Sequence, residues 1–519
     1  MALRSLFATL RRSNPQSLLR LEKTSARSFS SGSITMDDDL EEPQESRDND
    51  LKSRIFRLRF PKRSATTAIQ KWVDEGNKVT LSELRQLAKD LRKSQRYKHA
   101  LEILTWMEAQ NSFKTSAADH AIRLEMITRV CSLADAENYF ENIPDTSSQK
   151  AACLPLLHSY VRERATGKAE ALMLKLQGLG LTVNPHLYNE MMKLYVSTGQ
   201  SERVPHVIWQ MKQNRIPLNV LSYNLWMSAC SEVTSVTSAE MVYEEMMKDK
   251  NIEVGWSSHA TLANIYIRSG LSEKATAALR TAEQKLSTHK RLGYFFLITL
   301  YANLNDKNGV LRLWEASKVV PGRITCANYV CVLSCLVKIG DVGEAERVFR
   351  SWESEGRKYD IRVSNILLGA YTRNGWMDKA ESLHLHTLEK GGCPNYKTWE
   401  ILMEGWVKSK KMDEAITAMK KGFAMLKNCD WRPSSTIIMA IAEYFEEHGN
   451  FKDAKKYVKV LRRLDLASLP LYKSLLRVHV HAQIPAPDIL NMIEKDKIDM
   501  DEEACELIQC LSKMNAVED

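Results

Sequence analysis

The chain of 519 residues has no long apolar run, no disulfide framework and no familiar catalytic motif. Its longest apolar stretch, residues 294 to 300, is far shorter than the roughly 20 residues that span a membrane. The ten cysteines are not spaced as in small secreted proteins. A Gly-rich phosphate loop, a G-x-S-x-G nucleophile turn and an H-E-x-x-H zinc motif are all missing. We therefore expect no membrane span, no catalytic residue, no cofactor and no small-molecule substrate.

Metal-ligating residues are also poorly placed for a site. Cys326, Cys331 and Cys335 come closest to a cluster, but no C-x-x-C pair or nearby histidine completes a ligand set. His384 and His386 are two residues apart, so on a helix they point to different sides. We expect no metal site, and we interpret the three cysteines as small core residues.

A repeat of about 35 residues dominates the rest of the sequence, and two alignments reveal it. The matching position of the first helix in each unit is occupied by Tyr160, Tyr195, Cys230, Tyr266, Tyr301, Leu336, Tyr371 and Trp406. The matching position of the second helix is occupied by Ala169, Val204, Ala239, Ala275, Val310, Ala345, Ala380 and Ala415. A fixed period in this range is the signature of a solenoid.

One unit, residues 361–395, shows how the repeat is built. Its first half carries apolar residues at helical spacing, from Val363 to Tyr371, and Gly375 interrupts the pattern. A second helix follows, with Ala380 on its buried face. Two short antiparallel helices cannot bury their apolar faces alone, so each unit needs a neighbour on either side. The pattern predicts an all-α fold, an α/α superhelical solenoid of about ten to eleven antiparallel helix-pair repeats.

The spacing also predicts how the chain is organised. Residues 51–149 contain N-terminal helices and atypical capping repeats, one of which, residues 117–149, is a shortened copy. Residues 150–434 hold the regular 35-residue repeats, and residues 435–519 hold degenerate C-terminal repeats and a capping helix. Terminal repeats depart from the pattern because one of their faces must meet water.

Two polar segments precede the helices. Residues 1–36 are basic, rich in serine and poor in acid, with an apolar stripe near the start, which is typical of an organelle transit peptide. The Arg27-Ser28-Phe29 stretch predicts cleavage after Phe29 on entry to the mitochondrial matrix. Chloroplast targeting, or a plain basic tail, is the alternative. Residues 37–50 form an acidic linker that we expect to be disordered.

The charge is unevenly distributed along the chain. Residues 1–29 carry six bases and one acid, and residues 37–50 carry eight acids and one base. The net charge of +9 on the whole chain therefore corresponds to +11 on residues 51–519. A basic folded part is compatible with contacts to phosphate groups, and equally with a solvated surface.

Several stretches resemble one known repeat family. They are SNILLGAYTRNGWMDKAESL with GGCPN (364–395), YNEMMKLYVSTG (188–199) with IPLN (216–219), YNLWMSAC (223–230) and LVKIGDVGEAERVFRSWESEG (336–356). A helical hairpin of 35 residues ending in Pro-Asn or Tyr-Asp resembles the pentatricopeptide repeat family, of the P type found in plant organelles. The resemblance implies a superhelix that binds organellar RNA without catalysing a reaction. Some relatives add a deaminase-like domain, but its H-x-E and C-x-x-C zinc signature is absent here.

The resemblance also implies where RNA would be read. Each repeat offers the fifth residue of its first helix and its own last residue to one base. The resulting pairs are Leu154 with Asn184, Asn189 with Asn219, Asn224 with Gly255, Ala260 with Lys290, Phe295 with Thr325, Val330 with Asp360, Asn365 with Asn395 and Glu400 with Ser434. Two asparagine pairs fit the family pattern for a pyrimidine, cytosine more than uracil, and the other pairs depart from it. The candidate RNA-binding residues are Asn189, Asn219, Asn224, Asp360, Asn365 and Asn395.

Two interpretations of these asparagines stay open, since asparagine also caps helices and finishes turns. In the first, the protein is an RNA-binding adaptor of plant mitochondria with low or split sequence specificity. It would act on single-stranded RNA in transcript processing, stability or translation. In the second, the solenoid is a scaffold, for example in the mitochondrial ribosome, that contacts ribosomal RNA and ribosomal or other organellar proteins.

Overall fold

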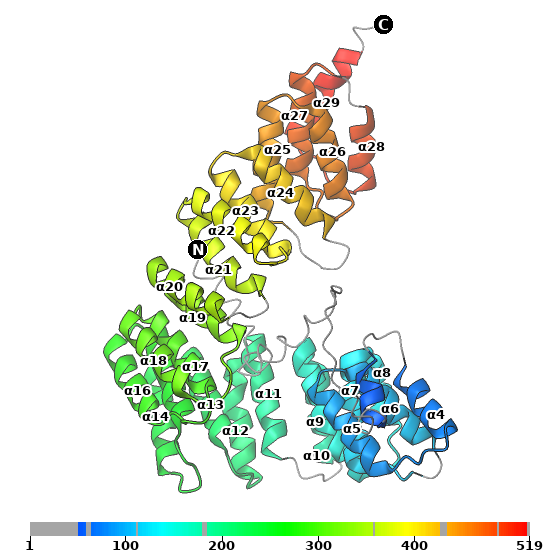
Figure 1. Cartoon of the computed structure of the whole chain (residues 1–519), viewed down its shortest axis with the longest axis vertical. Coiled ribbons are helices and arrows are strands. Elements are labelled where there is room, and N and C mark those ends of the chain that lie inside the picture. The colour runs from blue at the N-terminus through cyan, green and yellow to red at the C-terminus, as the bar shows by residue number, and fades with distance from the viewer. Residues whose placement is uncertain are drawn as a thin grey trace, which may run out of the picture. The chain divides into compact units, whose positions relative to one another are not determined.

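The computed structural model describes residues 50–58, 64–110, 113–178, 184–355, 359–425, 433–484 and 487–515. All regular elements in these ranges are helices, as the sequence predicts (Figure 1). The predicted transit peptide, residues 1–36, lies outside them, as does the acidic linker except for Asp50, which caps the first described helix. Within the same ranges, no helix is both long and apolar enough to cross a membrane.

The helices alternate between a first and a second member of each repeat. The first helices are α5 (Leu81–Lys93), α7 (Ala117–Val130), α9 (Thr146–Glu163), α11 (Pro185–Thr198), α13 (Val220–Val233), α15 (Trp256–Arg268), α17 (Leu292–Asn303), α19 (Cys326–Ile339), α21 (Ile361–Arg373), α23 (Tyr396–Lys408), α25 (Ser435–Glu447) and α27 (Leu469–His481). The second helices are α6 (Tyr97–Ala109), α8 (Leu133–Glu141), α10 (Thr166–Gly178), α12 (Val204–Gln213, after the 3₁₀ turn Ser201–Arg203), α14 (Val236–Lys248), α16 (Ser272–Gln284), α18 (Lys307–Val319), α20 (Val342–Ser354), α22 (Met377–Glu389), α24 (Met412–Ala424), α26 (Phe451–Arg462) and α28 (Pro487–Lys495). The short helices α3 (Leu51–Phe56) and α4 (Ala65–Asp74) precede them, and α29 (Glu502–Asn515) follows. The described residues thus hold twelve pairs, α5 to α28, slightly more than expected because α27 and α28 also pair.

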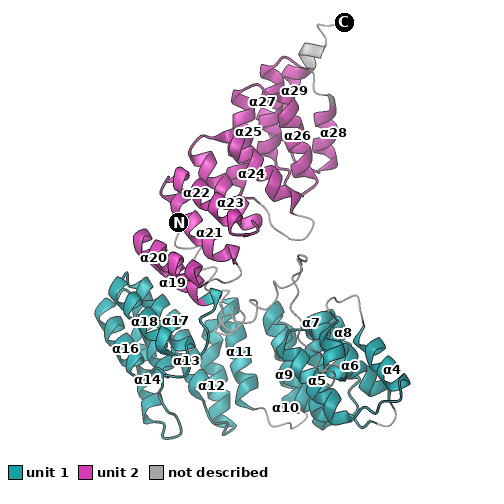
Figure 2. Cartoon of the chain, in the orientation of Figure 1, with its two compact units in different colours: residues 1–327 teal, residues 328–519 magenta. Residues whose placement is uncertain are grey.

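The chain divides into two units, residues 1–327 and residues 328–519 (Figure 2). In the first unit, α11 packs against α12 and against the next first helix, α13. In the second unit, α21 packs against α22 and α23 in the same way. Within each unit, most second helices also contact the first helix that follows them, as α12 contacts α13. Repeats therefore bury their apolar faces against their nearest neighbours, which is the packing of a solenoid.

The small residue predicted on each second helix lies in the core. Ala380 has an exposed fraction of 0%, and so do the other seven residues of the aligned series from Ala169 to Ala415. A side chain of this size lets the two helices of a repeat approach closely. The mostly aromatic series on the first helices is buried beside it, with Tyr371 at 7% exposure, except for Trp406, which is partly buried.

In several repeats the turn between the two helices contains a residue in the left-handed conformation. Gly199 follows α11 with φ of 77°, and Gly375 follows α21 with φ of 76°. Glycine tolerates this conformation because it has no Cβ. The chain then folds back so that the Trp376 N–H donates to the Tyr371 carbonyl at 2.9 Å. In the repeat of α21 and α22, this closure ends the first helix and starts the second.

Buried hydroxyl groups link one repeat to the next. The Tyr266 hydroxyl on α15 donates to Glu240 on α14 at 2.7 Å, and Lys274 on α16 pairs with the same carboxylate at 2.8 Å. Tyr371 donates to Glu346 at 2.8 Å, and the Trp406 indole N–H donates to Glu381 at 2.8 Å. The hydrogen bonds from Lys274 and Tyr266 hold the pKa of Glu240 below its usual value. The aromatic position of the repeat is thus an inter-repeat link as well as a core position.

Candidate nucleic-acid interface

The two residues of each predicted pair are brought together by helix capping. The last residue of one repeat is the N-cap of the next first helix, so Asn219 caps α13 and Asn395 caps α23. The other member lies five positions after the N-cap of its own helix, as Asn189 follows Asn184 on α11. Because adjacent first helices pack side by side, the cap of one meets the fifth residue of the other.

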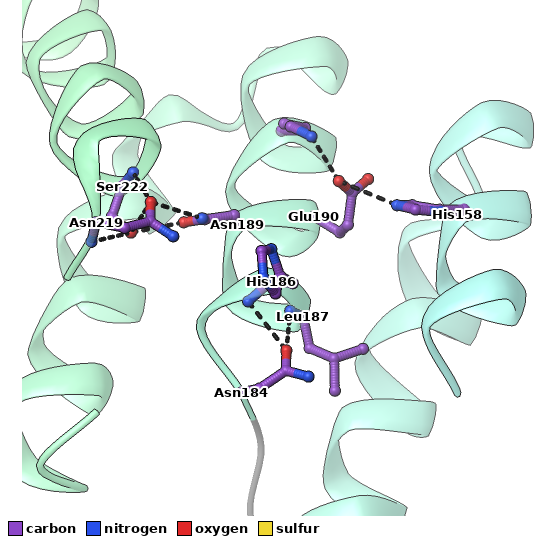
Figure 3. A network of polar contacts seen from close by, with 9 residues as sticks. His158, Asn184, His186, Leu187, Asn189, Glu190, Asn219 and Ser222 are labelled. Atoms are coloured by element: carbon purple, nitrogen blue, oxygen red, sulfur yellow. Dashed lines mark hydrogen bonds and ion pairs between the residues drawn. The ribbon is translucent and has the colours of Figure 1, made fainter. Parts of the chain in front are cut away.

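In the first unit the pair forms a closed hydrogen-bonded network (Figure 3). Asn189 donates from Nδ2 to Asn219 Oδ1 at 3.1 Å. The Ser222 hydroxyl donates to Asn189 Oδ1 at 2.8 Å. The Ser222 backbone N–H donates to Asn219 Oδ1 at 3.0 Å, which caps α13. Asn189 is only 1% exposed, so its amide is buried and has partners at both ends.

The second unit repeats the same network with other residues. Asn365 on α21 donates from Nδ2 to Asn395 Oδ1 at 3.3 Å, and Thr398 takes the place of serine. Its hydroxyl donates to Asn365 Oδ1 at 3.0 Å, and its backbone N–H donates to Asn395 Oδ1, also at 3.0 Å. Asn365 is 8% exposed. Two repeats that are five repeat lengths apart in the sequence therefore present the same group of side chains.

The backbone fixes which way each capping amide points. The Ser222 N–H can only donate, so the Asn219 atom that faces it is the oxygen. The Asn219 Nδ2 group then points away from the cap, and the same argument holds for Asn395 and the Thr398 N–H. Both capping residues are half-buried. Each network thus leaves an amide N–H₂ group of the capping residue available as a donor.

The third candidate asparagine lacks this arrangement. Asn224 on α13 is in register with Asn189, but the next N-cap is Gly255, which has no side chain. Among the described residues, Asn224 Oδ1 is buried and finds no hydrogen-bond partner. The same is true of the hydroxyl of Ser258, the residue that corresponds to Ser222. This repeat therefore has counterparts of Asn189 and Ser222, but Gly255 stands where the network needs an asparagine.

Asp360 is occupied by structural contacts. It caps α21 by accepting from the Arg362 backbone N–H at 3.0 Å, and its other oxygen pairs with the Arg362 guanidinium at 2.6 Å. Its predicted partner Val330 is half-buried and apolar. The carboxylate is thereby neutralised beside its own helix.

The remaining predicted pairs contain residues of the core or of surface ion pairs. Ala260 has no exposed area, and Phe295 is buried edge-on against Trp314 with ring centroids 6.1 Å apart. Glu400 pairs with Lys397 at 2.6 Å. These side chains offer no free group for the edge of a base.

Sequence reasoning missed three residues that complete or adjoin the two networks. Ser222 and Thr398 were detectable, since asparagine followed three residues later by serine or threonine is a capping box. Glu190, next to Asn189, is 5% exposed and contacts Lys193 at 2.5 Å and His158 of α9 at 3.3 Å (Figure 3). Burial raises the pKa of Glu190, but the contacts from His158 and Lys193 outweigh that effect and lower it. The contact between His158 and Glu190 joins α9 to α11 beside the asparagine pair.

No cluster of three or more potential metal ligands forms in the part of the chain that the structure describes. Of the three cysteines of the sequence cluster, Cys335 is buried, and Cys326 and Cys331 are partly buried.

Comparisons with known proteins place the chain in a family. A model of the pentatricopeptide repeat domain matches residues 171–232, and a model of the PPR repeat matches residues 221–251, 328–357 and 363–391. These matches fall on helices α10 to α14 and on helices α19 to α22.

Curated relatives cover most of the chain. The pentatricopeptide repeat-containing protein At5g27460 of Arabidopsis thaliana is 56% identical over 454 residues, 87% of this chain and 92% of the relative. A second Arabidopsis protein, pentatricopeptide repeat-containing protein At5g09450, mitochondrial, is 38% identical over 67% of this chain and 85% of its own length. Among solved structures, the maize pentatricopeptide repeat protein PPR10 is similar, with 15% identity, a TM-score of 0.37 and coverage of 90% of this chain and 78% of that one. On the identity and coverage of the curated relatives, this chain belongs to the pentatricopeptide repeat family.

Proposed function

We propose that the protein is a non-catalytic RNA-binding adaptor of plant mitochondria that acts in organellar transcript processing, stability or translation. It would recognise single-stranded RNA with split specificity, reading few bases and accepting the others. The observation that carries this proposal is the same asparagine, asparagine and hydroxyl network in two repeats, centred on Asn189 and Asn365.

The chemistry of the two networks suits a pyrimidine. The capping amides of Asn219 and Asn395 turn N–H groups outward, as the contacts to Ser222 and Thr398 require. Cytosine and uracil carry acceptor oxygens, and cytosine also a ring nitrogen acceptor, on the edge that an unstacked base offers. Burial of Asn189 and Asn365 holds each network rigid before RNA arrives. Rigid donors lose little conformational entropy on binding.

Targeting to mitochondria rests on the first residues and on the relatives. Residues 1–36 are basic, rich in serine and amphipathic. Several relatives, including the protein At5g09450, carry the word mitochondrial in their names. A fluorescent fusion of residues 1–60 should enter mitochondria and lose residues 1–29. A fusion that stays in the cytosol or enters chloroplasts alone would contradict this part of the proposal.

Aspartate substitutions at the two capping asparagines test base recognition without removing the helix caps. In the double variant Asn219→Asp and Asn395→Asp, a carboxylate oxygen still accepts the Ser222 and Thr398 backbone N–H groups, so the caps persist. The outward N–H₂ groups are replaced by acceptor oxygens. Affinity for a strand with cytosine at two positions five nucleotides apart should fall at least about tenfold, because each lost contact is worth about 1 to 3 kcal/mol. Filter binding at fixed salt measures this loss.

The matched control adds the same negative charge at other caps. Asn184 caps α11 and Ser434 caps α25, and neither belongs to an asparagine pair. The variant Asn184→Asp and Ser434→Asp should keep the preference for cytosine at the two spaced positions. An equal loss of preference in both variants would show that charge, and not base reading, causes the effect.

A scaffold role is the second candidate, and one observation favours it. Asn189 and Asn365 are almost fully buried and hydrogen-bonded within the protein, as helix-capping residues would be. In that case the protein would be a component of a larger assembly such as the mitochondrial ribosome. Sedimentation of the native protein with ribosomal particles, combined with equal affinity for all single strands, would support the scaffold and overturn sequence reading.

A further inference from the structure

Helix α26 in the second unit carries a straight row of positive charges on its outer face. The row consists of Lys452, Lys456, Lys459 and Arg463, the last of which is the C-cap of the helix. All four side chains are exposed. Their spacing of four, three and four residues places them on one face of the helix, and the row is about 16 Å long at 1.5 Å per residue. The opposite face holds the buried residues Ala454, Tyr457, Val458 and Leu461.

The cations of α26 fall into two groups, those with a carboxylate partner and those without one. Lys455 and Arg462, which lie to the side, pair with Asp488 at 2.9 Å and with Asp496 at 2.7 Å. In the described residues, Lys452, Lys459 and Arg463 have no carboxylate within ion-pair distance, and Lys452 only lies over the Phe451 ring.

One acidic group touches the row. Asp453 lies 3.4 Å from the ammonium of Lys456, and both side chains are mostly exposed. Asn450 donates to Asp453 and, with Lys456 and Lys420, holds the pKa of that carboxyl below its usual value. Since Lys420 belongs to the neighbouring helix α24, it adds a further cation at the edge of the row. Asp453 therefore does not cancel the charge of this face.

Other second helices do not share this charge pattern. Helix α22, with the sequence MDKAESLHLHTLE, contains three acids and one lysine. Helix α20, VGEAERVFRSWES, contains three acids and two arginines. Helix α26, FKDAKKYVKVLR, contains five cations and one acid. Like charges three or four residues apart destabilise a helix slightly. The positive charges of the row therefore repel one another, and a bound polyanion would reduce this repulsion.

We propose that this basic row binds the phosphate backbone of double-stranded RNA. Lysine and arginine side chains offer point charges to phosphates, and α26 has no exposed aromatic ring on which a base could stack. A duplex hides its base edges and presents rigid lines of phosphates, which proteins recognise by shape and charge. The inference goes beyond the proposed function, since it uses neither the asparagine pairs nor the first helices.

A charge-removal variant of the full chain tests the row. The substitutions Lys452→Gln, Lys459→Gln and Arg463→Gln remove three charges and no ion pair. Binding to a mixed-sequence RNA duplex of about 20 base pairs is measured between about 50 and 200 mM KCl. Each neutralised phosphate contributes about 0.9 to the slope of log affinity against log salt. We expect the slope to fall by about two to three and the affinity at 100 mM to fall at least about tenfold.

The control variant removes three exposed cations from other places. Lys71, Lys89 and Lys250 are exposed and scattered over α4, α5 and the turn after α14. Their change to glutamine should leave the slope nearly unchanged, and thermal melts should show that both variants fold. An equal loss in both variants, or no loss in the first, would overturn the proposal.

Two further measurements separate this surface from other partners. Vesicles of phosphatidylcholine with phosphatidylserine serve as an anionic membrane, and a loss confined to vesicle binding in the row variant would overturn the proposal. The variant Asn189→Ala and Asn365→Ala should keep its affinity for the duplex. If that variant also keeps full affinity for every single strand, the proposed base reading fails while the duplex surface stands.

Discussion

Asn189 and Asn224 occupy the same place in consecutive repeats, but their surroundings differ. Asn189 is fixed from both ends by Asn219 and Ser222. Asn224 has the matching hydroxyl, Ser258, but Gly255 replaces the capping asparagine, and both polar groups are left without partners in the described residues. One residue at the start of the next helix therefore decides whether the preceding amide is held in place. A prediction of base specificity for each repeat must therefore include the N-cap of the next first helix and the serine or threonine three residues after that cap.

The largest expected effect concerns the two complete networks. The double change Asn189→Ala and Asn365→Ala removes the partners that hold the capping amides of Asn219 and Asn395 in place. It should weaken binding to a matched single strand by about 2 to 6 kcal/mol, at about 1 to 3 for each base contact that these capping amides make. The slope against salt should stay nearly the same, since phosphate contacts set it. Titrations with RNAs that differ only at the two spaced positions measure both quantities. Equal affinities for all of these RNAs in the unmodified protein would favour the scaffold.

Overpacking one repeat should test whether the two networks are independent. Ala380→Leu should lower the free energy of unfolding by about 1 to 3 kcal/mol, because α22 can no longer lie close to α21. Repeats contact mainly their neighbours, so hydrogen exchange should rise first around Asn365 and Asn395. Protection of α11 and α13, which carry the first network, should stay. A uniform rise along the whole chain would argue against this local picture.

The incomplete network should be repairable with a single substitution. Gly255 has extended backbone with φ of −94°, and a Cβ there would meet nothing within 4 Å, so Gly255→Asn fits. The new amide should join Asn224 to Ser258 and raise the free energy of unfolding by about 1 to 2 kcal/mol. Gly255→Ala is the control, since it adds a side chain without a hydrogen bond and should not stabilise. Urea unfolding of the three proteins decides between these outcomes.

The smallest effect concerns the inter-repeat link that both kinds of repeat share. The pKa of Glu240 is lowered by hydrogen bonds from Lys274 and Tyr266, so the link stabilises the fold while Glu240 is ionised. This stability is present above the unfolded pKa and is lost as the pH falls through the lower folded pKa. Glu240→Gln should therefore cost less than about 1 kcal/mol at pH 7. The difference from the unmodified protein should shrink toward pH 4 in melting experiments.

Much of the architecture followed from the sequence because the repeat constrains it strongly. The period of 35 residues placed the paired helices, the small residue on each second helix and the mostly aromatic position on each first helix. The structure confirms the helix pairs and the burial of these positions, except that Trp406 is only partly buried. The predicted boundaries at residues 150 and 434 stay a prediction, since helix pairs continue on both sides of them. The targeting segment also stays a prediction.

The sequence determined the register of the candidate site, and only the tertiary structure decided its chemistry. The family resemblance implies the pairs Asn189 with Asn219 and Asn365 with Asn395, and the fixed period puts these pairs at equivalent places in their repeats. It did not reveal that Ser222 and Thr398 complete the networks, that Arg362 occupies Asp360, or that Asn224 lacks a partner. Hydrogen bonds between repeats depend on how closely adjacent helices pack, and the linear order of residues does not encode that distance directly. The basic row on α26 is another feature that the structure decides, since only the packed helices show which cations have carboxylate partners.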